Sequence, residues 1–127
     1  MTKILVVDDD LTALDIVDLM LEMKGFDVRR CTRGDQVRDS VKDDMPDLVL
    51  LDLMMPGVNG IKAAENIRKD GFKKPIIAFT AADDPEFHQQ AVTAGCNLVL
   101  TKPCKPPVLV EHMERLIAED EHAKVVN

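Results

Sequence analysis

Polar side chains of types that suit phosphoryl chemistry follow four short apolar runs in this sequence. The first run is followed by Asp8 and Asp9, the second by Asp52, the third by Thr80 and the fourth by Lys102. In an open parallel sheet the carboxyl ends of the strands face one crevice, where ligands bind. Neighbouring strands about 4.8 Å apart would place four strand ends within roughly 14 Å, close enough for these side chains to converge. The sequence therefore predicts a polar site at one edge of a parallel sheet.

Three carboxylates at one place need a compensating charge. Two unit charges about 4 Å apart repel by about 4 kcal/mol at an effective dielectric constant of about 20. Asp8, Asp9 and Asp52 must therefore either take up a proton or bind a cation. Oxygen ligands without His or Cys suit a hard divalent ion, magnesium first. Such an ion and the Lys102 ammonium would leave room for one phosphoryl group, held also by the Thr80 hydroxyl. An aspartate carboxylate can itself accept that group.

The elements that must position these residues alternate along the chain. Short apolar runs are typical of parallel strands covered on both faces, whereas one alternating run predicts a half-exposed strand at a sheet edge. Apolar stripes with helical spacing lie between the runs. We expect five strands and five helices in strict alternation, which is a three-layer, doubly wound α/β domain with one parallel sheet. The strand runs are 4–7, 26–29 (the alternating one), 48–51, 76–79 and 98–100, and the helices fall around 13–21, 37–41, 61–67, 85–94 and 109–117.

Local signals mark the helix ends. Asp10 is expected to cap the first helix and Thr32 the second. Asp84, followed by proline and glutamate, predicts the start of the fourth helix. Three glycines that follow helical stretches are expected at helix C-termini: Gly25, Gly71 and Gly95.

Composition restricts the class of protein. Of the 127 residues, 46% are apolar and 31% charged, which is typical of a soluble globular domain. A net charge of −7 with 3% aromatic residues disfavours nucleic-acid binding. There is no membrane-spanning run and no signal-peptide pattern, and three widely spaced cysteines indicate reduced thiols in a cytoplasmic protein. We expect one domain over residues 1–120, a polar C-terminal tail over 121–127 and no output domain in this chain.

The motifs at the strand ends resemble those of the receiver domain of two-component response regulators, the family of the chemotaxis response regulator. The resemblance extends over about residues 3–120. Each motif is common by itself, but their order and spacing together are specific. The matching motifs are Val7-Asp8-Asp9, Leu51-Asp52-Leu53-Met54-Met55-Pro56 with Gly60, Thr80-Ala81, and Lys102-Pro103.

The resemblance implies phosphorelay signalling by a domain that catalyses only its own phosphorylation and dephosphorylation. The phosphoryl donor would be a sensor histidine kinase, a phosphotransfer protein or a small acyl phosphate. The strand order would be 2-1-3-4-5, as in flavodoxin-like folds, and the bond before Pro103 would be cis. The phosphoacceptor would be Asp52, Thr80 and Lys102 would hold the phosphoryl oxygens, and magnesium would be bound by Asp9 and Asp52 directly, by Asp8 largely through water and by the backbone carbonyl of Met54.

This chain departs from the family pattern at several positions. Val99 stands where many members carry Tyr or Phe, and Cys104 stands where Phe is common after Lys-Pro. The charged residues that pair dimers in the winged-helix branch are not recognisable within 94–100. Two residues after the phosphoacceptor and after the strand-end threonine stand Met54 and Ala82, whose side chains cannot orient an attacking water. We therefore predict a long-lived acyl phosphate.

Each site residue also has a plain structural explanation. Acidic residues favour helix N-termini, so the aspartates after the first strand could serve only as caps. Thr80 is a common strand-end residue, and Lys102 could be an ordinary surface lysine. Asp52 resists this explanation, because a carboxylate at the end of a buried strand is rarely without a partner.

Two other functions fit part of the pattern. Asp8-Asp9-Asp10-Leu11-Thr12 also matches the DxDxT motif of haloacid-dehalogenase-like phosphohydrolases, with Asp8 as nucleophile and Asp10 as general acid. That interpretation needs a later acidic motif, for which only Glu111 and Glu114 are available, and it leaves Asp52 unexplained. The second alternative is a receiver-like interaction module that never turns over phosphate.

A receiver is a two-state switch, so phosphate on Asp52 should favour a conformation in which Thr80 turns toward it. We expect the loop 80–84 and the helix after it to move. Residues 85–118 are expected to form the surface that binds a downstream protein partner, without direct contact to nucleic acid or membrane.

Overall fold

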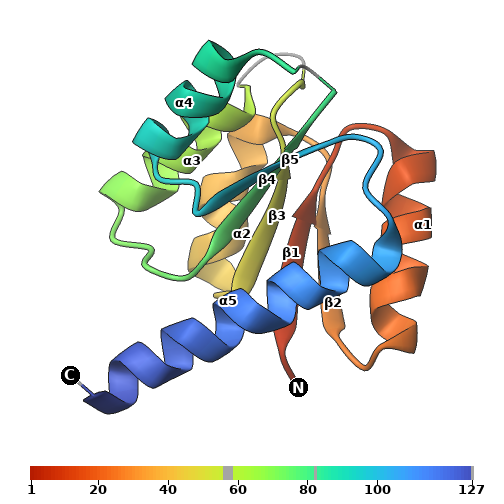
Figure 1. The fold of residues 1–127 in the computed structure, drawn as a ribbon, viewed down its shortest axis with the longest axis vertical. Helices are drawn as coiled ribbons and strands as arrows, with labels where there is room; N and C mark the ends of the chain where they lie inside the picture. The colour runs from red at the N-terminus through yellow and green to blue at the C-terminus, as the bar shows by residue number, and fades with distance from the viewer. Residues whose placement is uncertain (56–58, 82, 127) are drawn as a thin grey trace.

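A computed structural model describes residues 1–55, 59–81 and 83–126 of the chain (Figure 1). Within these residues, five parallel strands form one sheet in the order β2-β1-β3-β4-β5. The fold class and strand order expected from the sequence are therefore confirmed. The strands are β1 (Lys3–Val7), β2 (Asp27–Cys31), β3 (Leu48–Asp52), β4 (Ile76–Thr80) and β5 (Leu98–Thr101).

Helices cover both faces of the sheet, which gives the three layers (Figure 1). Side chains that alternate along β1 and β3 point to opposite faces. Ile4, Val6 and Leu50 pack with α1 and α5, whereas Leu5 and Val49 pack with α2, α3 and α4. The helices are α1 (Leu11–Met23), α2 (Val37–Asp43), α3 (Gly60–Lys69), α4 (Pro85–Ala94) and α5 (Pro106–Val126), and a 3₁₀ turn, η1 (Gly34–Gln36), precedes α2.

The aspartate caps form as expected. One carboxylate oxygen of Asp10 accepts hydrogen bonds from the backbone N–H groups of Thr12 and Ala13, at 3.0 and 3.3 Å. Asp84 caps α4 by accepting from the N–H of Glu86 at 3.0 Å. Both carboxylates satisfy N–H groups that the first helical turn leaves without partners.

The expected cap at Thr32 is wrong. The chain enters the second helical region through η1, whose preceding residue is Arg33, and no side-chain cap bond forms there. Gly34 is the first residue of that turn and is buried. The tighter 3₁₀ turn takes the place of the capped α-helical start that Thr32 would have supplied.

The edge strand β2 agrees with the sequence pattern, whereas the C-terminal segment extends a helix. The alternating strand β2 lies at the sheet edge, with Arg29 and Arg30 exposed. Residues 121–126, set apart in the sequence as a polar tail, continue α5, whose end runs away from the sheet in Figure 1. Among the helices of the described ranges, none combines the length and hydropathy that a membrane span requires.

Arg68 on α3 joins three segments, and within residues 1–55, 59–81 and 83–126 it forms no ion pair with a carboxylate. Its guanidinium donates to the carbonyls of Phe72, Lys74 and Gly95 and to the side-chain oxygen of Asn97, at 2.8–3.0 Å. Burial lowers the pKa of this guanidinium. Because each buried carbonyl left without a donor costs about 1–3 kcal/mol, the network ties α3 to the end of α4 and the start of β4.

We expect Arg68→Met to lower the free energy of unfolding by about 2–4 kcal/mol, since it keeps the apolar stem and removes all these donors. Urea unfolding followed by circular dichroism measures the change. Arg38→Met is the matched control: Arg38 pairs with Asp70 at the exposed surface, and its loss should cost less than about 1 kcal/mol. An equal decrease in the free energy of unfolding in the two variants would contradict a special structural role for Arg68.

Candidate functional site

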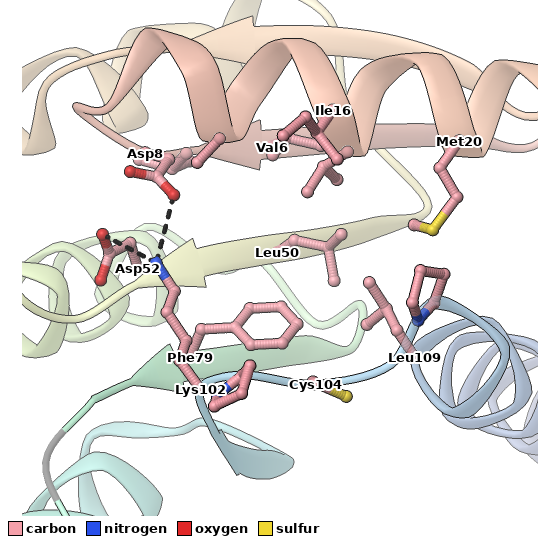
Figure 2. Close-up of a pocket in the computed structure, with 15 residues that line it drawn as sticks. Val6, Asp8, Ile16, Met20, Leu50, Asp52, Phe79, Lys102, Cys104 and Leu109 are labelled. Carbon is pink, nitrogen blue, oxygen red and sulfur yellow. Dashed lines mark hydrogen bonds and ion pairs between the residues drawn. The ribbon is translucent and has the colours of Figure 1, made fainter.

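The acidic and basic residues predicted at the strand ends lie together at the carboxyl edge of the sheet. Asp8 follows β1, Asp52 ends β3 and Lys102 follows β5. The Lys102 ammonium lies 3.3 Å from one oxygen of Asp8 and 3.5 Å from one oxygen of Asp52 (Figure 2). Two ion pairs of Lys102 thus join residues that are up to 94 positions apart in the chain.

Backbone N–H groups fix the orientation of both carboxylates. Asp8 accepts from the N–H of Asp10 through its other oxygen, and Asp52 accepts from the N–H of Met54 through its other oxygen, each at 3.0 Å. Each carboxylate therefore has one oxygen held by the backbone two residues on, while the second oxygen faces Lys102. The matching arrangements present two carboxylates to the same point in space.

The environment of Asp52 disfavours its charge. Asp52 and Asp8 are each 8% exposed. Burial raises the pKa of Asp52, and the neighbouring Asp8 raises it further, against the opposite effects of the Met54 N–H and Lys102. Burial alone would lower the pKa of Lys102, but the two carboxylates outweigh it, so this pKa is raised. The cluster holds more negative than positive charge and favours a further cation.

The carboxylates are close enough to share a metal ion. Asp8, Asp9 and Asp52 each offer an oxygen, and these oxygens lie within 4.8 Å of one another. Asp9 is exposed, which leaves one side of the group open to water. An all-oxygen set with an open side suits Mg²⁺, which usually keeps several waters. The residues present therefore fit the ion that the sequence predicted.

Thr80 and Lys102 lie at the carboxyl ends of two neighbouring strands, β4 and β5. Thr80 ends β4, is fully buried, and pairs with Thr101 in the β4–β5 register. The N–H of Lys102 donates to the carbonyl of Thr80 at 2.8 Å. The Lys102–Pro103 bond is cis, as expected. This places the hydroxyl-bearing and the ammonium-bearing residue side by side on the edge where Asp52 lies.

Gly60 allows α3 to begin against the end of β3. A Cβ at this glycine would lie 2.5 Å from the carbonyl oxygen of Asp52 and 2.6 Å from the Cα of Leu53, both backbone atoms. Only glycine permits this approach. The Gly60 N–H also donates to the Leu53 carbonyl at 3.2 Å. The helix start therefore supports the backbone of Asp52 directly.

Two further positions singled out in the sequence, Met54 and Val99, lie near the site or on the sheet beside it. The side chain of Met54 is 59% exposed, while its N–H holds Asp52. Val99 packs partly buried on the α2–α3–α4 side. Pro56 and Ala82 lie outside the described residues. Sequence reasoning missed the two carboxylate-orienting N–H groups, although an acidic residue two positions before a turn is the signal for this local bond.

The structure also bears on the phosphohydrolase alternative. Asp10, its required general acid, accepts two N–H bonds as the cap of α1. Asp52, which that alternative leaves unexplained, lies beside Asp8 and shares Lys102 with it. The two buried carboxylates of the site therefore lie at the ends of β1 and β3, and Asp10 caps the helix.

Comparison with known proteins agrees with this geometry. The model of the response regulator receiver domain family matches residues 4–114. The DNA-binding response regulator MtrA of Mycolicibacterium smegmatis is 36% identical over 127 residues, which cover 98% of this chain and 55% of that protein. The phosphate regulon transcriptional regulatory protein PhoB of Pseudomonas aeruginosa is 32% identical over 116 residues, covering 90% of this chain and 51% of that protein.

Solved structures show the same fold. The BeF3-activated N-terminal receiver domain of Klebsiella pneumoniae RstA matches with a TM-score of 0.86 at 28% identity, over 91% of this chain and 98% of that chain. A CheY-like receiver domain protein from Methanospirillum hungatei matches with a TM-score of 0.92 at 25% identity, over 97% and 98% of the two chains.

The fold and site define an α/β domain with an acidic crevice and an adjacent lysine. The chain belongs to the receiver domain family of two-component response regulators, a family of signalling domains. It spans about half the length of the curated relatives it matches.

Proposed function

We infer that this chain is a phosphoacceptor whose Asp52 takes a phosphoryl group from a histidine kinase, a phosphotransfer protein or a small acyl phosphate. The observation that carries this proposal is the Lys102 ammonium between Asp8 and Asp52, beside three carboxylate oxygens within 4.8 Å of one another. Asp9 and Asp52 would hold magnesium directly, Asp8 largely through water, and the backbone carbonyl of Met54 would complete the set. Family membership supports a kinase as the partner.

The side chains of the site would promote a single displacement reaction at the phosphorus atom. A carboxylate oxygen of Asp52 attacks the phosphorus while the bond to the donor nitrogen or oxygen breaks. An acyl phosphate donor leaves as its carboxylate anion, whereas a histidine donor leaves as a neutral imidazole, with a proton from water where its ring carries none. When bound by these residues, magnesium would supply positive charge against the transferring oxygens. Lys102 and Thr80 hold those oxygens from the neighbouring strand ends, and the Met54 N–H keeps Asp52 aimed.

Incubation with Mg²⁺ and acetyl phosphate, read by intact mass, tests the proposal. We expect the mass of one phosphoryl group per chain, its loss in hydroxylamine because the bond is an acyl phosphate, and no gain when Mg²⁺ is chelated. Absence of any gain would favour a passive interaction module, and a gain that persists without Mg²⁺ would contradict the proposed metal site.

The acyl phosphate is expected to be long-lived, because Met54 is an exposed side chain beside the site that cannot orient a water. We predict that Met54→Asn, which adds a donor and an acceptor there, shortens the lifetime at least about tenfold, which is less than the roughly 10²–10⁴-fold that a positioned general acid or base contributes. Loss of phosphate from purified phosphoprotein is followed by intact mass. Met45→Asn, at another exposed methionine away from the site, serves as control. An unchanged lifetime in Met54→Asn would contradict this prediction.

Signal output is proposed to pass through residues 85–118, which comprise α4, β5 and the first turns of α5. Thr80 is buried at the end of β4 and pairs with β5, so its rotation toward a phosphoryl group would alter this side of the sheet. We propose a protein partner in the cytoplasm and no direct nucleic-acid contact by this segment, in keeping with the net charge of −7.

Phosphorylation should therefore change backbone amide chemical shifts across 85–118 as well as around Asp52. A ¹⁵N–¹H correlation spectrum before and after acetyl phosphate, in Mg²⁺, measures this. The β2 edge and α2 provide the internal control and should change little. Shift changes confined to the strand ends would contradict the proposed output surface.

A further inference from the structure

A cavity of about 300 Å³ lies between α1 and α5, next to the phosphoacceptor site (Figure 2). Val6, Leu50 and Phe79 of the sheet form its floor. Figure 2 shows Asp8, Asp52 and Lys102 gathered at one end, and Met20 and Leu109 at the other. The cavity is thus apolar along its length and ionic at one end.

The cavity is large enough for a small organic molecule. It has about twice the volume of an engineered cavity of about 150 Å³ that binds benzene, and it reaches the lower limit of about 300 Å³ for ligand pockets. Cys104 contributes a small side chain at the wall where the chain enters α5. A body of about 10–12 non-hydrogen atoms, such as a two-ring aromatic group, fits this volume.

The charge at the ionic end of the cavity determines which polar head group a ligand can place there. Two carboxylates against one ammonium leave one negative charge over, and each carboxylate oxygen has a lone pair beyond its single described bond. An anionic head would be repelled there, whereas a single ammonium would balance the charge and donate to free acceptor positions. The end of the cavity therefore favours a monocation.

We propose that this cavity binds a compact hydrophobic ammonium compound, with its aromatic body between α1 and α5 and its head at Asp8 and Asp52. Such a ligand uses the carboxylate oxygens that the proposed function assigns to magnesium, so the two compete. That competition rests on the proposed function, whereas the binding itself rests on the cavity and its charge. A hydrophobic amine would thus lower the rate of phosphorylation.

The probe is 1-naphthylmethylammonium, with 1-naphthylmethanol as its neutral and 1-naphthoate as its anionic analogue. The chain contains no Trp or Tyr, so naphthyl emission is read without protein background. We expect saturable binding of the ammonium to the Mg²⁺-free protein, about tenfold tighter than the alcohol, with the carboxylate weakest. Equal affinity for ammonium and alcohol, or no saturable binding, would overturn the proposal.

Two substitutions that fill the cavity test whether the ammonium probe binds there. Cys104→Phe and Ala13→Leu, from opposite walls, should each weaken ammonium binding about tenfold, while Cys104→Ser keeps it within about threefold. Acetyl phosphate labelling should persist in all three, which shows that the fold is intact. Full binding in both filled variants would overturn the cavity as the site.

Addition of Mg²⁺ separates this proposal from the proposed function. Saturating Mg²⁺ should weaken the ammonium about tenfold and leave the alcohol unaffected. Ammonium binding that Mg²⁺ does not change would overturn the placement of the head group. Labelling that succeeds while no probe binds would refute the ligand site and leave the phosphoacceptor role standing.

Discussion

Asp52→Asn is expected to reduce phosphoryl incorporation to less than about one-hundredth of the wild-type rate, because an amide oxygen is not a nucleophile toward phosphorus. The shape of the side chain and its bond from the Met54 N–H are retained, so the loss would report chemistry rather than folding. Intact mass after incubation with Mg²⁺ and acetyl phosphate measures the rate.

The same substitution should stabilise the Mg²⁺-free protein at neutral pH. Folding raises the pKa of Asp52, chiefly through burial, so the ionised carboxylate is destabilising above its unfolded pKa, and this penalty grows as pH rises through the folded value. The neutral amide removes it and raises Tm. Mg²⁺ should raise the Tm of the wild type and have a smaller effect on Asp52→Asn, since one ligand is lost.

Asp10→Asn is the matched control for this variant. It makes the same substitution two residues from Asp8, and asparagine caps helices about as well as aspartate. Phosphorylation should continue in Asp10→Asn. If instead Asp10→Asn abolished phosphorylation and Asp52→Asn did not, Asp10 would be a reacting residue and the phosphoacceptor assignment would be wrong.

Lys102→Met should slow phosphorylation about 10²–10³-fold, because it removes a donor aimed at the transferring oxygens. It should also strengthen Mg²⁺ binding, since the ammonium that now compensates Asp8 and Asp52 is gone. A slower reaction with tighter metal binding is a combination that simple unfolding cannot produce. The rate is followed by intact mass and Mg²⁺ affinity by isothermal titration calorimetry.

Lys105→Met is the control, because Lys105 is an exposed lysine three residues away on the same loop. It should alter neither quantity by more than about twofold, as expected for an exposed charge screened by solvent. A Lys102→Met protein that phosphorylates at the wild-type rate would show that this ammonium only compensates the carboxylates.

The convergence of the site could be predicted because it follows from backbone topology. Asp52 follows the continuous apolar run 48–51, and such a run is typical of a strand of a parallel sheet that is covered on both faces. Once β1, β3 and β5 share one sheet, the residues after them must lie at one edge. The alternating pattern of β2 likewise predicted its place at the edge.

Other features depend on side-chain packing and could not be predicted in this way. The cavity between α1 and α5 is lined by small residues such as Ala13 and Cys104, which come from segments about 90 residues apart. A periodic pattern within one helix or strand carries no information about packing between such distant segments. The start of α2 differed for a local reason: a 3₁₀ turn at Gly34 competes with a capped helix beginning after Thr32, and the two have similar sequence signals.

Peptide mapping of the phosphorylated protein tests the central claim most directly. Trypsin separates the two candidate acceptors, since Asp8 falls in the peptide 4–24 and Asp52 in the peptide 43–62. After reaction with acetyl phosphate in Mg²⁺, borohydride reduction would mark the phosphorylated aspartate permanently. We predict the mark on Asp52 alone, and a mark on Asp8, or on neither peptide, would contradict the account.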